Sequence, residues 1–175
     1  MPIPFAEYFA RIQECLPRLY GIRVVFSEIP DPLLGDLDGL EIQIDPSCTA
    51  EQRLFLSAHL FGHTAQWNLD ARAFELGSRY SPPVAEENIP AVLEYEREAA
   101  AYALGMLHKI GIRDVDSWFS DYAACDEAYL LNYYRTGIKR EFRSFWVDHV
   151  QLVQPKSVPP FTPVKRRFRL DGVVI

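Results

Sequence analysis

Apolar residues near the start of the chain recur at intervals of three and four. This spacing predicts a helix from about residue 4 to residue 19 with one apolar face. Gly21 ends the helix, and Pro17 lies in its last turn. The apolar face consists of Phe5, Phe9, Ile12, Leu16 and Leu19.

Short β-branched and alternating segments follow this helix. Residues 22–26 (IRVVF) predict a strand, and residues 40–45 alternate apolar with polar side chains, as in a strand with one wet face. Asp38 and Gly39 form a hairpin-turn dipeptide that pairs the second segment with a strand around residues 33–37. We therefore expect a small antiparallel sheet.

Most of the remaining chain predicts helices. Thr49 and Gln52 form a capping-box pair, and the nearly continuous apolar run behind them indicates a helix to about residue 70 that is buried on most sides. A polar loop is expected over 77–88, a helix over 88–110, another from 114 or 116 to about 134, and a further one around 142–149.

Prolines dominate the chain after residue 154. We therefore divide the sequence into a single domain over residues 1–154 and a proline-rich extended C-terminal arm over residues 155–175. The last residues, 168–175, are expected to add an edge strand or to cross the surface. The fold class is α/β (α+β), with the small sheet packed on a mainly helical body.

Composition narrows the class of protein. The 175 residues are 49% hydrophobic and 24% charged, which suits one globular domain with a substantial core. The net charge of −6 makes nucleic acid an improbable partner. Three widely spaced cysteines without a CxxC pair favour a reducing cytoplasm, and neither a secretory signal nor a membrane-spanning run is expected.

His59 and His63 are the residues with the clearest chemical potential. Four positions apart on one helix, their imidazoles lie on the same face and match two corners of a tetrahedral zinc site. The spacing alone is equally compatible with two core histidines bonded to backbone carbonyls.

A third zinc ligand would have to come from another helix. Glu94 and Glu98 share one face of the helix over 88–110, and that face continues to Ala101 and Gly105. Small residues over 99–105 would allow this helix to pack closely on its neighbour and bring a carboxylate to the histidines.

These segments resemble the core of the ImmA/IrrE-type zinc metallopeptidases, a gluzincin-type HExxH family with a zincin-like fold. Residues 58–63 read AHLFGH where the family has AHELGH, and residues 96–103 read EREAAAYA where it has a pattern close to ExEANxFA. The resemblance covers roughly residues 22–110. It implies His59, His63 and Glu98 as zinc ligands, with Glu94 as an alternative third ligand. It also implies cleavage of a repressor protein as the family's activity.

Leu60 replaces the glutamate that the family uses as general base, so the sequence describes a degenerate HExxH site. Three outcomes follow. The chain is a pseudo-peptidase, a catalytically impaired homologue that binds a protein or peptide partner and keeps zinc or only the fold. Alternatively, it is an active zinc hydrolase in which another group, Glu94 or His149, supplies the base. The third outcome is a metal-free structural or interaction module.

Overall fold

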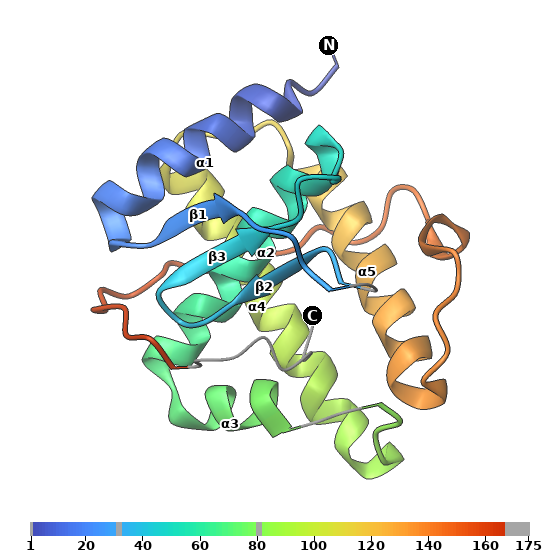
Figure 1. Cartoon of the computed structure of the whole chain (residues 1–175). Coiled ribbons are helices and arrows are strands. Elements are labelled where there is room, and N and C mark those ends of the chain that lie inside the picture. Colours follow the sequence, from blue (N-terminus) through green and yellow to red (C-terminus); the bar gives the residue numbers. More distant parts are fainter. Residues whose placement is uncertain (1, 31–32, 80–81, 167–175) are drawn as a thin grey trace.

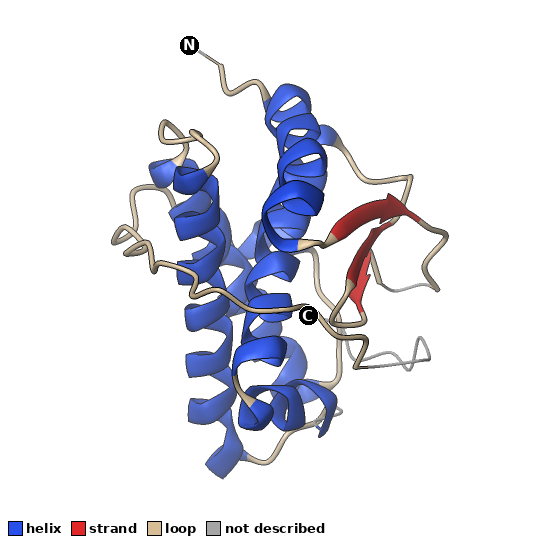
Figure 2. Ribbon diagram, turned by 90° about the vertical axis from the view of Figure 1, so that its left-hand side faces the viewer, coloured by secondary structure: helices blue, strands red, loops and turns tan. Residues whose placement is uncertain are grey.

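The computed structural model of the chain describes residues 2–30, 33–79 and 82–166. Within them, a three-stranded sheet lies on one side of a body of five α-helices (Figures 1 and 2). The elements are α1 (Phe5–Tyr20), β1 (Arg23–Phe26), β2 (Gly35–Leu37), β3 (Glu41–Ile44), α2 (Ala50–Leu69), α3 (Ala71–Arg79), η1 (Glu86–Asn88), α4 (Ile89–Lys109), α5 (Asp116–Thr136) and η2 (Phe142–Phe145).

The sheet is mixed, so the expectation of an antiparallel sheet was only half right. Its order is β1-β3-β2, with β1 parallel to β3 and β2 antiparallel to it. The Asp38-Gly39 turn forms as predicted, with Gly39 at a φ of 95°. The chain reverses once between β1 and β2 and again at this hairpin. Two reversals leave β3 running in the same direction as β1.

Helix α2 forms the centre of the molecule. The predicted capping box is present, because the Thr49 hydroxyl accepts from the Gln52 amide and the Gln52 side chain accepts from the Thr49 amide. The helix contacts α1, the sheet, α3 and α4, so nearly its whole circumference is buried. This accounts for an apolar pattern without a polar stripe.

Helix α4 packs against α2 more closely than side chains usually allow. A Cβ placed on Gly62 would lie 2.1 Å from the backbone oxygen of Ala99. Ala99 and Ala103 are fully buried on the same face of α4. The expected close packing of small residues is therefore confirmed, and it brings polar side chains of the two helices within hydrogen-bonding distance.

Residues 146–166 cross the surface without regular secondary structure. The Val153 amide donates to Ser120 of α5, the Lys156 amide donates to the Ala101 carbonyl of α4, and the Val164 amide donates to Asn68 of α2. This segment, here called the strap, thus ties three helices together.

Two helical predictions differ from the structure. Helix α3 covers residues 71–79, where a loop was expected from residue 77, and η2 reduces the predicted helix over 142–149 to four residues. Residues 168–175, for which an edge strand or a surface crossing was expected, lie outside the described residues.

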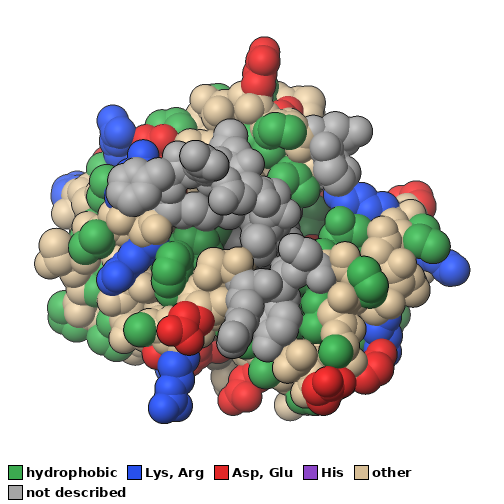
Figure 3. All heavy atoms as spheres, turned by 60° about the horizontal axis from the view of Figure 1, so that its bottom comes forward, with side chains coloured by type: hydrophobic (Ala, Val, Ile, Leu, Met, Phe, Trp, Pro, Cys, Tyr) green, Lys and Arg blue, Asp and Glu red, His purple; other side chains and the backbone are tan. Residues whose placement is uncertain are grey.

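The described helices are all too short or too polar to cross a membrane. On the face at the bottom of Figure 1, apolar side chains are interspersed with acidic and basic ones (Figure 3). The chemically distinctive groups lie instead in the interior, between α2, α4 and α5.

Candidate metal centre

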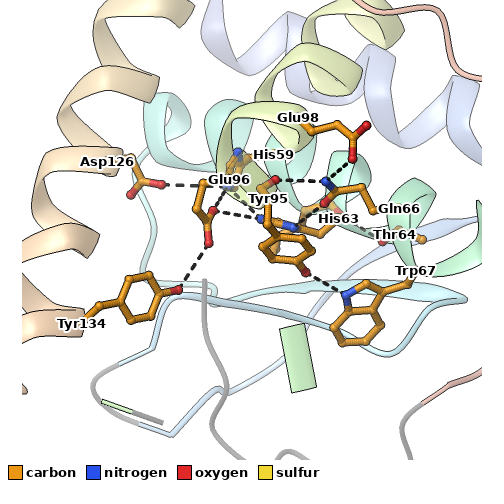
Figure 4. A network of polar contacts seen from close by, with 11 residues as sticks. His59, His63, Thr64, Gln66, Trp67, Tyr95, Glu96, Glu98, Asp126 and Tyr134 are labelled. Carbon is orange, nitrogen blue, oxygen red and sulfur yellow. Dashed lines mark hydrogen bonds and ion pairs between the residues drawn. The ribbon is translucent and has the colours of Figure 1, made fainter. Parts of the chain in front are cut away.

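Helix α2 brings the two histidines together as their spacing predicted. Their Nε2 atoms are 3.1 Å apart, and the ring planes are nearly perpendicular. His59 is 3% exposed and His63 is fully buried, and the His59 ring stacks on Phe55. Both imidazoles therefore present the same nitrogen to a single point inside the protein (Figure 4).

Glu96 of α4 supplies the third group. Its Oε2 atom lies 3.1 Å from His59 Nε2 and 3.1 Å from His63 Nε2, and the residue is 4% exposed. The three ligand-type atoms thus form a triangle with sides of 3.1 Å. Among the described residues, these three form the one group of histidine, cysteine and carboxylate side chains with metal-site geometry.

The size of the triangle fits a metal ion. Zinc binds histidine nitrogen and carboxylate oxygen at about 2.0–2.2 Å, which in a tetrahedron separates the ligand atoms by roughly 3.3 Å. Two imidazoles and one carboxylate are also the ligand set of several catalytic zinc sites. The residues present therefore fit a zinc-type site with one open coordination position.

Neighbouring side chains favour the ionised form of Glu96 in this buried group. Burial raises the pKa of Glu96, but the neighbouring His63 and His59 outweigh burial and lower that pKa to about 2. The hydroxyl of Tyr134 on α5 donates to Glu96 Oε1 at 3.3 Å. Glu96 is thus held as a carboxylate, with one oxygen facing the histidines and the other facing α5.

Asp126 of α5 is a second carboxylate near the histidines, and it was not foreseen from the sequence. Its Oδ2 atom lies 4.0 Å from His59 Nε2, which is beyond the ligand triangle. Burial raises the pKa of Asp126 to about 7, against the lowering effect of His59. The residue stands where it could contact a molecule bound beside His59.

The structure places Glu96, rather than Glu98, beside the histidines. Successive helical residues turn by about 100°, so positions 96 and 98 point to opposite sides of α4. Glu98 instead accepts from Gln66 at 2.8 Å and pairs with Lys156 of the strap. Glu94, proposed as the alternative ligand or base, is exposed.

A signal for Glu96 was present in the sequence. Glu96 precedes Ala99, Ala100 and Ala103 by three, four and seven positions, the spacing of one helical face. This face packs on α2. The face chosen from the sequence, which runs through Ala101 and Gly105, meets the strap instead, because the Lys156 carbonyl lies where a Gly105 side chain would be.

Leu60 lies on a different side of α2 from the histidine nitrogens. It is 1% exposed and packs towards β2, where its Cδ1 atom is 2.8 Å from the position of a Cβ on Gly35. His149, the other candidate base, is exposed and has a φ of 60°. Neither residue offers a proton acceptor within the buried group.

A cavity of about 780 Å³ reaches the ligand triangle from between α4 and α5. His59 and Glu96 form part of its wall, and residues 150–154 of the strap cover one side. A smaller cavity of about 120 Å³ lies between β2 and α5, and Asp126 lines both cavities. The walls of the larger cavity are formed mainly by short side chains, among them Ala100, Ala101, Ala123, Ala124 and Ala128.

Comparisons with protein-family models, with curated proteins and with solved structures gave no significant match to this chain. The class of the protein is therefore defined by its own features, an α/β fold with a buried His-His-Glu group.

Proposed function

We propose that this chain is a zincin-like, ImmA/IrrE-type metallopeptidase homologue with impaired catalysis, which binds a metal ion and acts by binding a protein partner. The main support is the triangle of His59, His63 and Glu96 with Leu60 in place of the catalytic glutamate. The ligands of the peptidase chemistry are retained, and its proton acceptor is missing.

His59, His63 and Glu96 would hold the metal, and zinc fits this set of donors. A bound zinc ion supplies Lewis acidity for a carbonyl oxygen and acidifies water. Tyr134 orients Glu96 through its other oxygen. Loss of the signature glutamate removes general-base catalysis, which typically contributes about a hundred- to ten-thousand-fold in rate.

A protein segment is the partner that suits the cavity. Its walls combine apolar side chains, which expose most of the wall, with charged and polar ones, and they include Leu152, which is 48% exposed. The resemblance to a family that acts on repressor proteins points in the same direction.

Elemental analysis of protein purified without chelator tests the metal site. We expect about one zinc per chain in the native protein, and loss of that zinc in His59→Ala and Glu96→Ala. Glu127→Ala is the matched control, because it removes a carboxylate of the same cavity that pairs with Arg97. Metal-free native protein would contradict the proposal and favour a metal-free interaction module, and zinc retained in Glu96→Ala would contradict it by showing that these three residues do not hold the metal.

A peptidase assay with added zinc tests the impairment. We expect no measurable cleavage of peptide libraries by the native protein, and gained cleavage in Leu60→Glu if only the base is missing. Because Leu60 is buried against β2, that variant needs a folding control by circular dichroism.

One observation favours a second function, an active zinc hydrolase with a displaced base. Asp126 lies 4.0 Å from His59 Nε2 and lines the cavity. It would take a proton from water held beside His59 as the water oxygen attacks a carbonyl carbon. It would then return that proton to the departing nitrogen as the C–N bond breaks. Native activity that disappears in Asp126→Asn, with zinc retained, would establish this function and refute the impairment.

A further inference from the structure

Gln66 links the candidate metal centre to the surface of the protein. Its side-chain nitrogen donates to the Tyr95 carbonyl at 3.0 Å and to Glu98 Oε2 at 2.8 Å. Both partners can only accept, so this assignment of the amide is the one that satisfies them. The amide oxygen must then face His63 Nδ1, which lies 3.0 Å away (Figure 4).

This orientation fixes the tautomer of His63. An amide oxygen can only accept, so His63 Nδ1 must carry a hydrogen. In the neutral ring, Nε2 then presents its lone pair towards His59 Nε2 and the Glu96 carboxylate. A lone pair on Nε2 that faces the other two groups is what a metal ligand requires.

We propose that Gln66 is a positioning residue of the metal centre that holds His63 in the Nδ1–H tautomer, and that Glu98 and Lys156 hold Gln66 in place. This inference rests on the proposed metal site and adds that the strap is coupled to it. The residue that the resemblance named as a ligand, Glu98, acts two hydrogen bonds away from His63.

The increase in exposure from Gln66 to Glu98 and Lys156 supports this arrangement. Gln66 is 2% exposed, whereas the side chains of Glu98 and Lys156 are 39% and 48% exposed. Lys156 is also held by its backbone, because its amide donates to the Ala101 carbonyl at 2.9 Å and its carbonyl packs on Gly105. The ammonium group is therefore anchored beside Glu98 by main-chain contacts as well as by charge.

His59 differs from His63 in the hydrogen bonding of its Nδ1 atom. Its Nδ1 atom is buried without a hydrogen-bond partner among the described residues. A hydrogen-bond chain to the surface through Gln66 thus serves His63 alone, and substitutions in that chain should act directly on His63.

Zinc affinity, measured by competition with a chromogenic chelator, tests the energetic part of the proposal. Gln66→Leu should weaken zinc binding roughly ten- to a hundred-fold, as substitution of residues that orient metal ligands typically does. Glu98→Ala and Lys156→Met should weaken it by about three- to ten-fold, because Gln66 keeps its bond to Tyr95. Glu86→Ala, which removes an exposed ion pair with Arg135, should leave the affinity unchanged.

Long-range ¹H–¹⁵N NMR of the histidine rings tests the tautomer directly, in metal-free protein in alkaline buffer. The native spectrum should show His63 protonated at Nδ1, and Gln66→Leu should populate the other tautomer of that ring. An Nε2–H tautomer of His63 in the native protein would overturn the inference. So would zinc binding by Gln66→Leu with native affinity. A native protein that shows the tautomer but binds no zinc would refute the proposed function instead.

Discussion

Gly62 of α2 lies directly against Ala99 of α4, so closely that a Cβ on Gly62 would come within 2.1 Å of the Ala99 carbonyl oxygen. The contact falls between His59 and His63 along α2 and between Glu96 and Ala103 along α4. Close approach of the two backbones at this point is what brings a short glutamate side chain within 3.1 Å of both histidines.

Gly62→Ala should therefore push the two helices apart. We expect a loss of about 1–3 kcal/mol in the free energy of unfolding, because the methyl group meets backbone rather than a flexible side chain. Urea denaturation measures this loss. Ser78→Ala, at an exposed position of α3, controls for the gain in helix propensity. Unchanged stability of Gly62→Ala would mean that the helices are further apart than described.

Gly35 and Leu60 should be energetically coupled. Gly35→Ala should destabilise the protein by about 1–3 kcal/mol, because its methyl group meets Leu60 Cδ1 at 2.8 Å. Leu60→Ala should cost about 2–5 kcal/mol through the cavity it leaves.

The double variant should lose less than the sum of these two changes, because each substitution makes room for the other. A cycle with Leu104→Ala, in the core on α4, provides the additive control. Additive effects of Gly35→Ala and Leu60→Ala would show that the two side chains do not compete for space.

Tyr134→Phe should weaken zinc binding without abolishing it. The variant removes the hydroxyl that donates to Glu96 Oε1 and leaves the ring in place. We expect about a three- to ten-fold loss of affinity, equivalent to one ordinary hydrogen bond. Tyr133→Phe, one residue earlier on α5, should bind zinc as the native protein does, and equal behaviour of the two variants would contradict this role for Tyr134.

Asp45 should make the stability of the protein depend on acidic pH. Hydrogen bonds from the Ser47 side chain, and then from the Ser47 and Ile29 amides, hold the pKa of Asp45 below its usual value of 3.8. The stability contributed by its charge is present above that value and is lost as pH falls through the lower, folded-state pKa.

Asp45→Asn should consequently be less stable than the native protein near neutral pH, with the difference shrinking as the solution is acidified below about pH 4. Chemical denaturation at several pH values checks this. A difference that stays constant with pH would show that the carboxylate charge contributes nothing.

The three cysteines should resist thiol reagents in the folded protein. All three are buried, and burial, assisted by the nearby Asp126, raises the pKa of Cys125 to about 12. Thiolates are the reactive form, so modification should wait for unfolding. We expect a slow reaction with a disulfide reagent in buffer and three thiols titrated in denaturant. One thiol reacting at once in buffer would contradict this burial.

Local sequence patterns predicted the parts of the molecule that local physics determines. The capping box at Thr49, the turn at Gly39 and the histidine spacing on α2 each depend on residues within a few positions of one another. The overall assignment of a small sheet on a helical body followed from the same patterns.

Contacts between segments distant in the sequence determine the features that the sequence patterns could not predict. Choosing between Glu96 and Glu98 required knowing which face of α4 meets α2 and which meets the strap, and both faces carry small residues. The parallel pairing of β1 with β3 likewise depends on the path of the loop between β1 and β2. Asp126 lies in a helix outside the resembling region, so only the tertiary structure brings it towards His59.

The strap also has a consequence for the order in which the protein forms during synthesis. Helices α2 and α4 leave the ribosome well before Lys156, so the His-His-Glu group can assemble while the lysine that braces Glu98 is still inside the exit tunnel. The three ligand residues of a nascent chain would therefore be available before the lysine that holds Glu98 and, through it, Gln66. In that order of synthesis, the strap would be the last of these segments able to pack against the helices.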